Sequence, residues 1–210
     1  MSGFDNRTGK ALPFEDALTK DLEGQGFCVA RNGTEHTFPE FTGQLRRSND
    51  STSLAIRFQP DGVACIGRIP RSFYWEAKAS RKIEKTAYEQ YMAIHRMGGV
   101  LVVVFQWDTG DWRWNFIEDV RLIPGSDTVS KFPPDRRFPV VNEWITPRGS
   151  QRWEIVKSNS SQASGTPYRE VNEASLLKWN AFKPAIVERL SIATNIWRHT
   201  GQQLPAEVIA

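Results

Sequence analysis

The chain has 210 residues, 40% of them hydrophobic, and a formal net charge of +3 at pH 7. This length can bury a full core, and we expect an α/β domain at 1–157, a linker at 158–170 and a C-terminal helical extension at 171–210. No apolar stretch is long enough to span a bilayer and no signal-peptide pattern is present, so we expect a cytoplasmic protein of a bacterial, archaeal or phage-infected cell, with no membrane partner.

The first predicted element is a helix that carries Glu15. This acid falls on the same helical stripe as Leu18 and Leu22, so we expect its side chain to face the sheet. One alternative is a solvated acid favoured by the helix dipole. Another is that Glu23 is the inward-facing acid, although the glycines that follow it indicate that the helix ends there.

A β-hairpin is predicted next. Its strands and turn are expected at 63–66, 73–78 and 67–71. Folding the chain about this turn sets Asp61 opposite the segment that contains Glu76 and Lys78. Side chains alternate across a strand, so Glu76 and Lys78 share one face and lie near their cross-strand neighbours. Two carboxylates and one ammonium group should therefore converge.

This grouping suits metal-dependent phosphodiester chemistry. Carboxylate oxygens bind Mg²⁺ or Mn²⁺ without a full protein cage and leave positions for water and a phosphate oxygen. A neighbouring lysine can orient the attacking water or stabilise developing charge. The alternative is a partly buried ion pair on a sheet face, because short acid-x-Lys patterns are common.

A second helix is predicted after the hairpin. Ser80 is its expected N-cap, and two successive glycines at 98–99 end it. Gln90 lies in an otherwise apolar stripe, formed by Ile83, Ala87, Ile94 and Met97. A buried amide needs a partner, so we expect Gln90 to hydrogen-bond near the sheet, to the carboxylate cluster, a water or the backbone.

The remaining elements follow from hydrophobic runs and turn residues. The run 100–105 suits a strand buried on both faces. Trp112, Trp114 and Phe116 alternate in a further strand, where they either pack against a helix, which we favour, or stack on bases. A hairpin turned at 147–149, a flexible link at 158–167, an N-cap at Asn172 and a helix at 184–198 complete the chain. The last helix either completes the core or forms a dimer contact.

The two cysteines and three histidines lack metal-ligand spacing. Cys28 and Cys65 fall in strand-like segments, so we expect free buried thiols. The histidines are scattered and are expected to be surface residues or satisfied core residues.

The motif Pro60-Asp61 with Glu76-Ala77-Lys78 resembles the PD-(D/E)XK nuclease superfamily, whose core has an αβββαβ arrangement. The residues before it resemble Holliday-junction resolvases of the archaeal Hjc and bacterial RecU types; they are Gly9, Lys10, Glu15, Leu18, Leu22, Gly26, Phe27 and Arg31. The resemblance covers roughly 9–106. It departs from the RecU type at 33–53, where a polar insert stands in place of a long protruding stalk.

The resemblance implies a restriction-endonuclease-like core, with a mixed central sheet flanked by helices. It implies a Mg²⁺-dependent (or Mn²⁺-dependent) endodeoxyribonuclease, first of all a Holliday-junction resolvase that acts as a homodimer on branched DNA. Asp61, Glu76, the Ala77 carbonyl and Glu15 would hold the metal, Lys78 would position the hydrolytic water, and Gln90 would border the site. The alternatives are a restriction-like or repair nuclease of the same superfamily, and a DNA-binding or assembly protein that keeps the fold without turnover.

A basic rim surrounds the predicted site. Its members are Arg68, Arg71, Arg81, Lys82 and Lys85. A basic rim around an acidic site attracts a polyanion, so these residues are predicted to contact DNA phosphates. A solvated helix start would give a similar pattern.

Overall fold

The structure is a computed structural model that describes residues 5–32, 52, 55–56, 58–67, 69–108, 110–123, 128–129, 142–146, 149–153 and 167–200. It is a mixed α/β fold with a central, mostly antiparallel sheet. The helices are α1 (Asp5–Gly24), α5 (Lys85–Arg96) and α6 (Phe182–Thr200). The main sheet contains β1 (Phe27–Arg31), β2 (Gly62–Ile66), β3 (Ser72–Lys78), β5 (Leu101–Asp108), β6 (Asp111–Phe116) and β11 (Leu177–Lys178).

The main sheet has the strand order β1-β2-β3-β5-β6-β11. All neighbouring strands are antiparallel except β3 and β5, which are parallel. A parallel pair needs a crossover connection, and α5 supplies it. Along the chain these elements follow in the order α1, β1, β2, β3, β4, α5 and β5.

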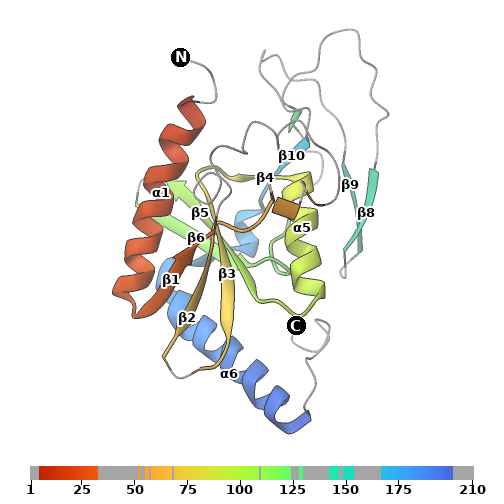
Figure 1. Cartoon of the computed structure of the whole chain (residues 1–210). Helices are drawn as coiled ribbons and strands as arrows, with labels where there is room; N and C mark the ends of the chain where they lie inside the picture. Colours follow the sequence, from red (N-terminus) through yellow and green to blue (C-terminus); the bar gives the residue numbers. More distant parts are fainter. Residues whose placement is uncertain are drawn as a thin grey trace.

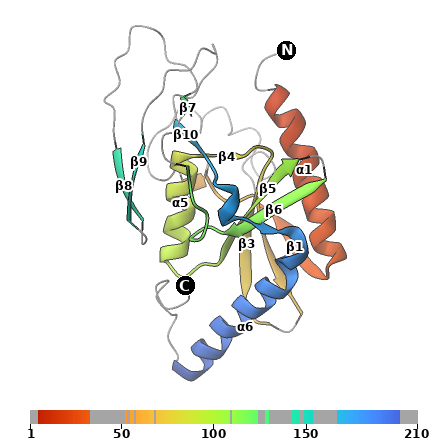
Figure 2. The ribbon, with the colours of Figure 1, turned by 180° about the vertical axis from the view of Figure 1, so that it is seen from behind.

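Helices cover both faces of this sheet (Figures 1 and 2). Phe14, Leu18 and Leu22 of α1 share one core cluster with Phe182 and Ile186 of α6. The other cluster contains the buried side chains of α5, among them Ala87, Tyr88, Tyr91 and Met92. The main sheet thus lies between α1 and α6 on one side and α5 on the other.

Strand β5 is buried on both faces, as its continuous apolar run predicts. Val102 and Val104 belong to the cluster beneath α1 and α6, whereas Leu101, Val103 and Phe105 belong to the cluster beneath α5. A strand enclosed on both sides has no solvent face to be polar. This strand is the centre of the core.

The aromatic residues of β6 pack against helices. The Trp112 ring lies edge-to-face with Phe14 of α1 at 5.4 Å between centroids, and Trp114 lies edge-to-face with Phe182 of α6 at 4.9 Å. Such pairs stabilise a core beyond the area they bury. Packing, rather than base stacking, is therefore the role of this row.

Three short strands form a second sheet in the order β4-β10-β7. They are β4 (Lys82–Glu84), β10 (Pro167–Glu170) and β7 (Thr128–Val129), and β8 (Asn142–Thr146) pairs with β9 (Gly149–Trp153) in the predicted hairpin. The predicted start of the second helix is wrong: the structure places Ser80 in a bend, and α5 begins at Lys85 because β4 pairs with β10. Residues 167–170, predicted as part of a linker, are the strand that makes this pairing.

The C-terminal helix completes the core of the monomer. Phe182, Ile186 and Leu190 of α6 are fully buried in the main cluster. Before it come two 3-10 turns, η2 (Glu173–Ser175) and η3 (Trp179–Ala181), and Asn172 caps η2 by accepting a hydrogen bond from the Ala174 peptide at 3.0 Å. The boundaries of the α/β domain, linker and extension stay a prediction.

The cysteines depart from the prediction of buried thiols. Cys28 of β1 and Cys65 of β2 are directly opposed across the two strands, and both are free and exposed. The neighbouring residue Phe27 is buried in the main cluster, so the alternation of the strand turns Cys28 to the opposite face.

Among the described helices, none is long and apolar enough to cross a membrane.

Candidate active site

Strand pairing brings the predicted acidic residues together. The β2–β3 register pairs Gly62 with Trp75, which sets the preceding Asp61 opposite Glu76. Gly62 is required there, because a Cβ on it would lie 2.4 Å from the Trp75 indole and 2.5 Å from the Ala30 carbonyl oxygen. The absence of a side chain leaves room for the Trp75 indole beside Gly62 in this register.

Reciprocal hydrogen bonds hold the two carboxylates side by side. The Ala77 peptide donates to Asp61 Oδ2 at 2.7 Å, and the Asp61 peptide donates to Glu76 Oε2 at 3.2 Å. The Asp61 carbonyl accepts a bond from the Asn32 peptide at 2.7 Å, which fastens this corner to the end of β1. Both acids are therefore positioned by the backbone of the sheet rather than by a loop.

Lys78 lies on the same face of β3 and forms an ion pair with Glu76 Oε1. Burial lowers the pKa of Lys78, but the Glu76 and Asp61 carboxylates and the hydrogen bond to Glu76 outweigh burial, and the net shift is upward. The side chain therefore keeps its proton. It can orient water and stabilise negative charge, but it cannot act as a base.

The Asp61 carboxyl is held in an unfavourable environment. Burial raises its pKa well above the ordinary value, the Glu76 and Glu15 carboxylates raise it further, and Lys78 and the Ala77 peptide only partly offset these effects. Among the described residues, two acids share one lysine at this position. A divalent ion bound there would supply further positive charge.

Glu15 faces the sheet, as its helical stripe predicts. It is 5% exposed, whereas the alternative acid Glu23 is exposed on α1. The Arg31 guanidinium binds Glu15 Oε2 at 2.7 Å and Asp16 Oδ1 at 2.5 Å. Glu15 thus lies within electrostatic reach of Asp61, but Arg31 of the adjacent strand already engages its carboxylate.

The donor atoms fit a hard cation. Among the described residues no three His, Cys, Asp or Glu side chains gather tightly enough to enclose a metal, so Glu15 does not join Asp61 and Glu76 as a close third ligand. Mg²⁺ is commonly held by one or two carboxylates, with waters and substrate phosphate oxygens in the other positions. Asp61 and Glu76 meet this lesser requirement.

Tyr91, rather than Gln90, is the α5 residue that reaches the cluster. Gln90 is half-buried and its side chain forms no hydrogen bond to another described residue. Tyr91 is 2% exposed, and burial, the Glu76 and Asp61 carboxylates and a hydrogen bond to Glu76 raise its pKa. The Lys78 ammonium lies 5.6 Å from the centroid of the Tyr91 ring. The predicted stripe was therefore one residue out of phase at this point.

Glu84 is a second residue that the sequence did not single out. It lies in β4 at the start of α5, and its carboxylate raises the pKa of both Lys78 and Tyr91. The Tyr168 hydroxyl contacts Glu84 Oε2 at 3.3 Å. No local pattern could identify Glu84, because the contact with Tyr168 joins positions that are 84 residues apart.

The basic residues of the predicted rim differ in the contacts that they make with other protein groups. Arg81 binds the Trp107 carbonyl and Asp108 and lies over the Trp107 ring. Lys82 is 3.5 Å from Glu170, and Lys85 is buried beside Glu89. Arg71 makes no hydrogen bond or ion pair with another described residue, and the prediction for Arg68 lies outside the described residues.

Comparison with solved structures finds similarity to Hjc, a Holliday junction resolvase from the archaeal hyperthermophile Archaeoglobus fulgidus. The match has 20% sequence identity and a TM-score of 0.36, and it covers 54% of this chain and 78% of that chain. No family model and no curated protein matches the sequence. A likeness of this size carries no argument about activity. Any inference about activity therefore depends on the geometry of the site.

Proposed function

We propose that this protein is a metal-dependent endodeoxyribonuclease of the PD-(D/E)XK type, with a restriction-endonuclease-like core. One observation carries the proposal: Asp61 and Glu76 lie side by side at the end of a hairpin, and Lys78 is the only cation close to them among the residues that the structure describes. A purely structural ion pair has no need of the second carboxylate. An excess of buried negative charge supports a site for a divalent cation.

Each residue of the site would have a distinct role in hydrolysis. Asp61 and Glu76, helped by the Ala77 carbonyl, would hold Mg²⁺ or Mn²⁺, which polarises the phosphate and lowers the pKa of a bound water. The Lys78 ammonium would orient that water and stabilise charge on the phosphoryl oxygens. Tyr91 would hold Glu76 in place, and Glu15 would add to the field at Asp61.

A Holliday-junction resolvase is the particular enzyme that we propose, because the motif order and spacing resemble this group. A junction presents two equivalent strands, so symmetric cleavage requires two sites and hence a homodimer. The other candidates are a restriction-like or repair nuclease, and a DNA-binding protein on the same fold. The retention of Asp61, Glu76 and Lys78 favours an enzyme over the last of these.

The test is incubation of the purified full chain with labelled four-way junctions, linear duplexes and single strands, in Mg²⁺ or in EDTA. We expect paired, symmetric nicks in the junction, in Mg²⁺ only. Cleavage of one sequence in duplex DNA would identify a restriction-like enzyme instead. Binding to all three forms without cleavage in Mg²⁺ or Mn²⁺ would contradict the nuclease proposal.

The matched control is Asp16→Asn beside Asp61→Asn. Asp16 is an exposed carboxylate on α1 that is bound by Arg31, so it lies near the site without belonging to it. We expect Asp61→Asn to lose cleavage and Asp16→Asn to keep it. Equal loss in both variants would point to a general effect of removing acidic charge.

A further inference from the structure

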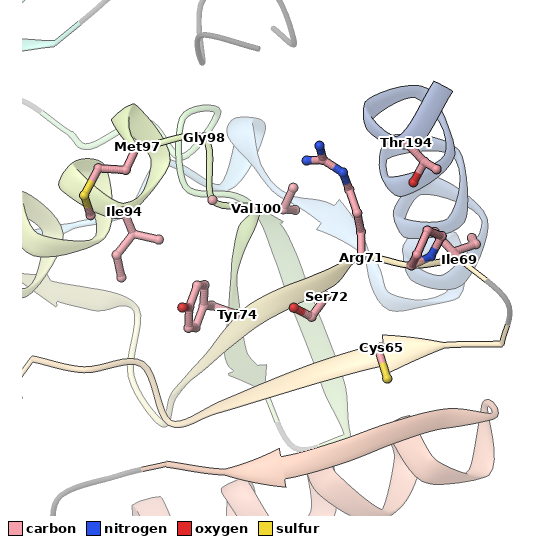
Figure 3. Close-up of a pocket in the computed structure, with 12 residues that line it drawn as sticks. Cys65, Ile69, Arg71, Ser72, Tyr74, Ile94, Met97, Gly98, Val100 and Thr194 are labelled. Carbon is pink, nitrogen blue, oxygen red and sulfur yellow. The ribbon is translucent and has the colours of Figure 1, made fainter. Parts of the chain in front are cut away.

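A cavity of about 790 Å³ opens on the sheet face that carries the candidate active site. Its walls are the hairpin turn and β3, the C-terminal end of α5 and one residue of α6, Thr194 (Figure 3). The volume lies within the usual range for cavities that bind small organic ligands or parts of larger ones.

The polar side chains of the cavity, those of Arg71, Ser72 and Tyr74, can donate hydrogen bonds to a ligand with acceptor atoms. The Arg71 side chain extends between α6 and the segment around Gly98, and none of the described residues that line the cavity is acidic (Figure 3). Within the described part of the chain, Arg71, Ser72 and Tyr74 form no side-chain hydrogen bonds. An arginine without a counter-ion, accompanied by two hydroxyl groups, favours a phosphate-bearing ligand.

The apolar part of the lining suits a flat ring. Tyr74 and Ile94 line the cavity together, and Met97 stands at its rim with 72% of its surface exposed. An aromatic face and a flexible thioether are surfaces on which a nucleobase can rest. Phosphate recognition and base contact are therefore available in one cavity.

The position of the cavity connects it to the candidate active site. Ser72, Tyr74, Glu76 and Lys78 alternate along one face of β3, and Tyr91 and Ile94 of α5 lie over that same face. Four residue-to-residue steps along the extended strand lead from Ser72 to Glu76, a distance of about 13 Å. A nucleic-acid strand spans that distance in a few nucleotides.

We propose that this cavity binds one nucleotide of the DNA strand whose phosphate lies at Asp61 and Glu76, with Arg71 on the phosphate and Tyr74 against the base. The inference rests on the proposed function for the identity of the strand. Binding in the cavity does not require the metal or the cleavage step. It can therefore be measured when cleavage is prevented.

The first experiment measures binding of a fluorescent single-stranded oligothymidylate of about ten nucleotides, a typical site size for such proteins, to the full chain in EDTA. We expect Arg71→Ala to weaken binding about tenfold and to reduce the slope of log affinity against log salt by about one. Arg121→Ala removes an exposed arginine outside the cavity and should change neither quantity. An unchanged affinity and slope in Arg71→Ala would overturn the proposal.

A second variant covers the apolar contact, and a second ligand tests the source of the phosphate. Tyr74→Leu keeps much of the packing and should lower the affinity for the oligonucleotide several-fold. The slope of log affinity against log salt should not change, since a base contact carries no charge. Thymidine 5′-monophosphate should bind far more weakly than the oligonucleotide. Equally tight, Arg71-dependent binding of the mononucleotide would mean that the cavity serves a free nucleotide, and the strand proposal would fail.

The final arm separates this proposal from the nuclease proposal. If the protein cleaves DNA, Arg71→Ala should slow cleavage of substrates that extend several nucleotides past the cut and should not affect substrates that end at it. A loss that is independent of substrate length would contradict the cavity proposal and leave the nuclease intact. A protein that binds the oligonucleotide through Arg71 but cuts nothing would leave the cavity and remove the nuclease.

Discussion

Two of the charged clusters that the structure describes differ in their contents. The side chain of Glu118, just after β6, is 8% exposed and meets Arg189 of α6 and His95 of α5, the latter with Nδ1 at 3.3 Å. Asp61 and Glu76 on the sheet share one ammonium, that of Lys78. Burial raises the pKa of Glu118, but His95 and Arg189 oppose the shift, whereas Glu76 adds to the shift at Asp61.

The two clusters differ in charge balance, and we propose a function only for the Asp61 cluster. In the Glu118 cluster a single acid ties two helices on opposite faces of the sheet to the end of β6, and Arg189 pairs with its charge. In the Asp61 cluster the acids outnumber the cation among the described residues. Folding alone gives no reason to keep such an excess, but a bound divalent ion does. Opposite responses to mutation should therefore distinguish the two clusters.

The largest effect is expected when a ligand acid is neutralised. Asp61→Asn or Glu76→Gln should reduce cleavage in Mg²⁺ by more than about 10³-fold, because a metal contributes several kcal/mol to the transition state. DNA binding should stay equal or become tighter, since negative charge near the phosphates is removed. Single-turnover cleavage and anisotropy titrations measure the two quantities. A Glu118→Gln variant with the same catalytic loss would remove the distinction between the clusters.

The second effect concerns stability, and here we expect the larger change from mutation of Glu118 rather than of Asp61. Glu118→Ala removes the buried carboxylate that Arg189 binds and should lower the free energy of unfolding by about 3–5 kcal/mol. Asp61→Asn relieves repulsion and should leave the metal-free protein equally or more stable. Urea denaturation in EDTA gives both values. A Glu118 variant as stable as the wild type would show that the Glu118 cluster does not stabilise the packing of α5 and α6.

The third prediction concerns Lys78, the cation that the described residues bring to the candidate site. Lys78→Ala should lower the cleavage rate by about 10²–10³-fold, the usual cost of losing one transition-state donor. The control is Lys183→Ala, whose ammonium binds the Gln25 carbonyl on the α1 side of the sheet. Rates at saturating DNA separate the chemical step from binding. If both variants cleave normally, Lys78 is only a structural ion-pair partner.

The fourth prediction tests the phase of α5. Tyr91→Phe removes the hydroxyl that hydrogen-bonds Glu76 and should lower the affinity for Mg²⁺ or the cleavage rate by about 10–100-fold, as for other residues that orient a ligand. Tyr88→Phe is the matched control, because that hydroxyl contacts the Val120 carbonyl instead. Gln90→Ala should resemble the control. A loss at Gln90 with none at Tyr91 would restore the prediction made from the sequence.

The smallest effect is a dependence on pH. The pKa of Asp61 is raised in the folded protein, so the metal-free fold is more stable when this carboxyl is protonated and loses that stability as pH rises through the raised value. Mg²⁺ requires the deprotonated form. Its affinity should therefore increase with pH, by up to about tenfold per unit below the raised pKa, and then level off. Calorimetric titrations with Mg²⁺ at several pH values measure this, and a flat profile would contradict it.

Local sequence determined the β2–β3 hairpin and the pairing of the acids. Period-2 alternation put Glu76 and Lys78 on one face of β3 and Trp75 and Ala77 on the other, where the last two lie in the core. The hairpin turn was marked by glycine and proline, so the partner of Asp61 followed by counting along two strands. These features depend on neighbours that are close in the sequence, and short-range patterns report such neighbours well.

Features fixed by distant residues were decided only by the tertiary structure. Lys82–Glu84 form a strand because Tyr168–Glu170 pair with them, and this moves the start of α5 and brings Tyr91 to Glu76. Apolar residues recur on several sides of this helix, so periodicity alone did not fix which side is buried. The same limit applies to Cys65, where alternation gives the face but only the placement of the helices decides whether that face is covered. Hydrophobic pattern selects a face, and long-range pairing decides what that face meets.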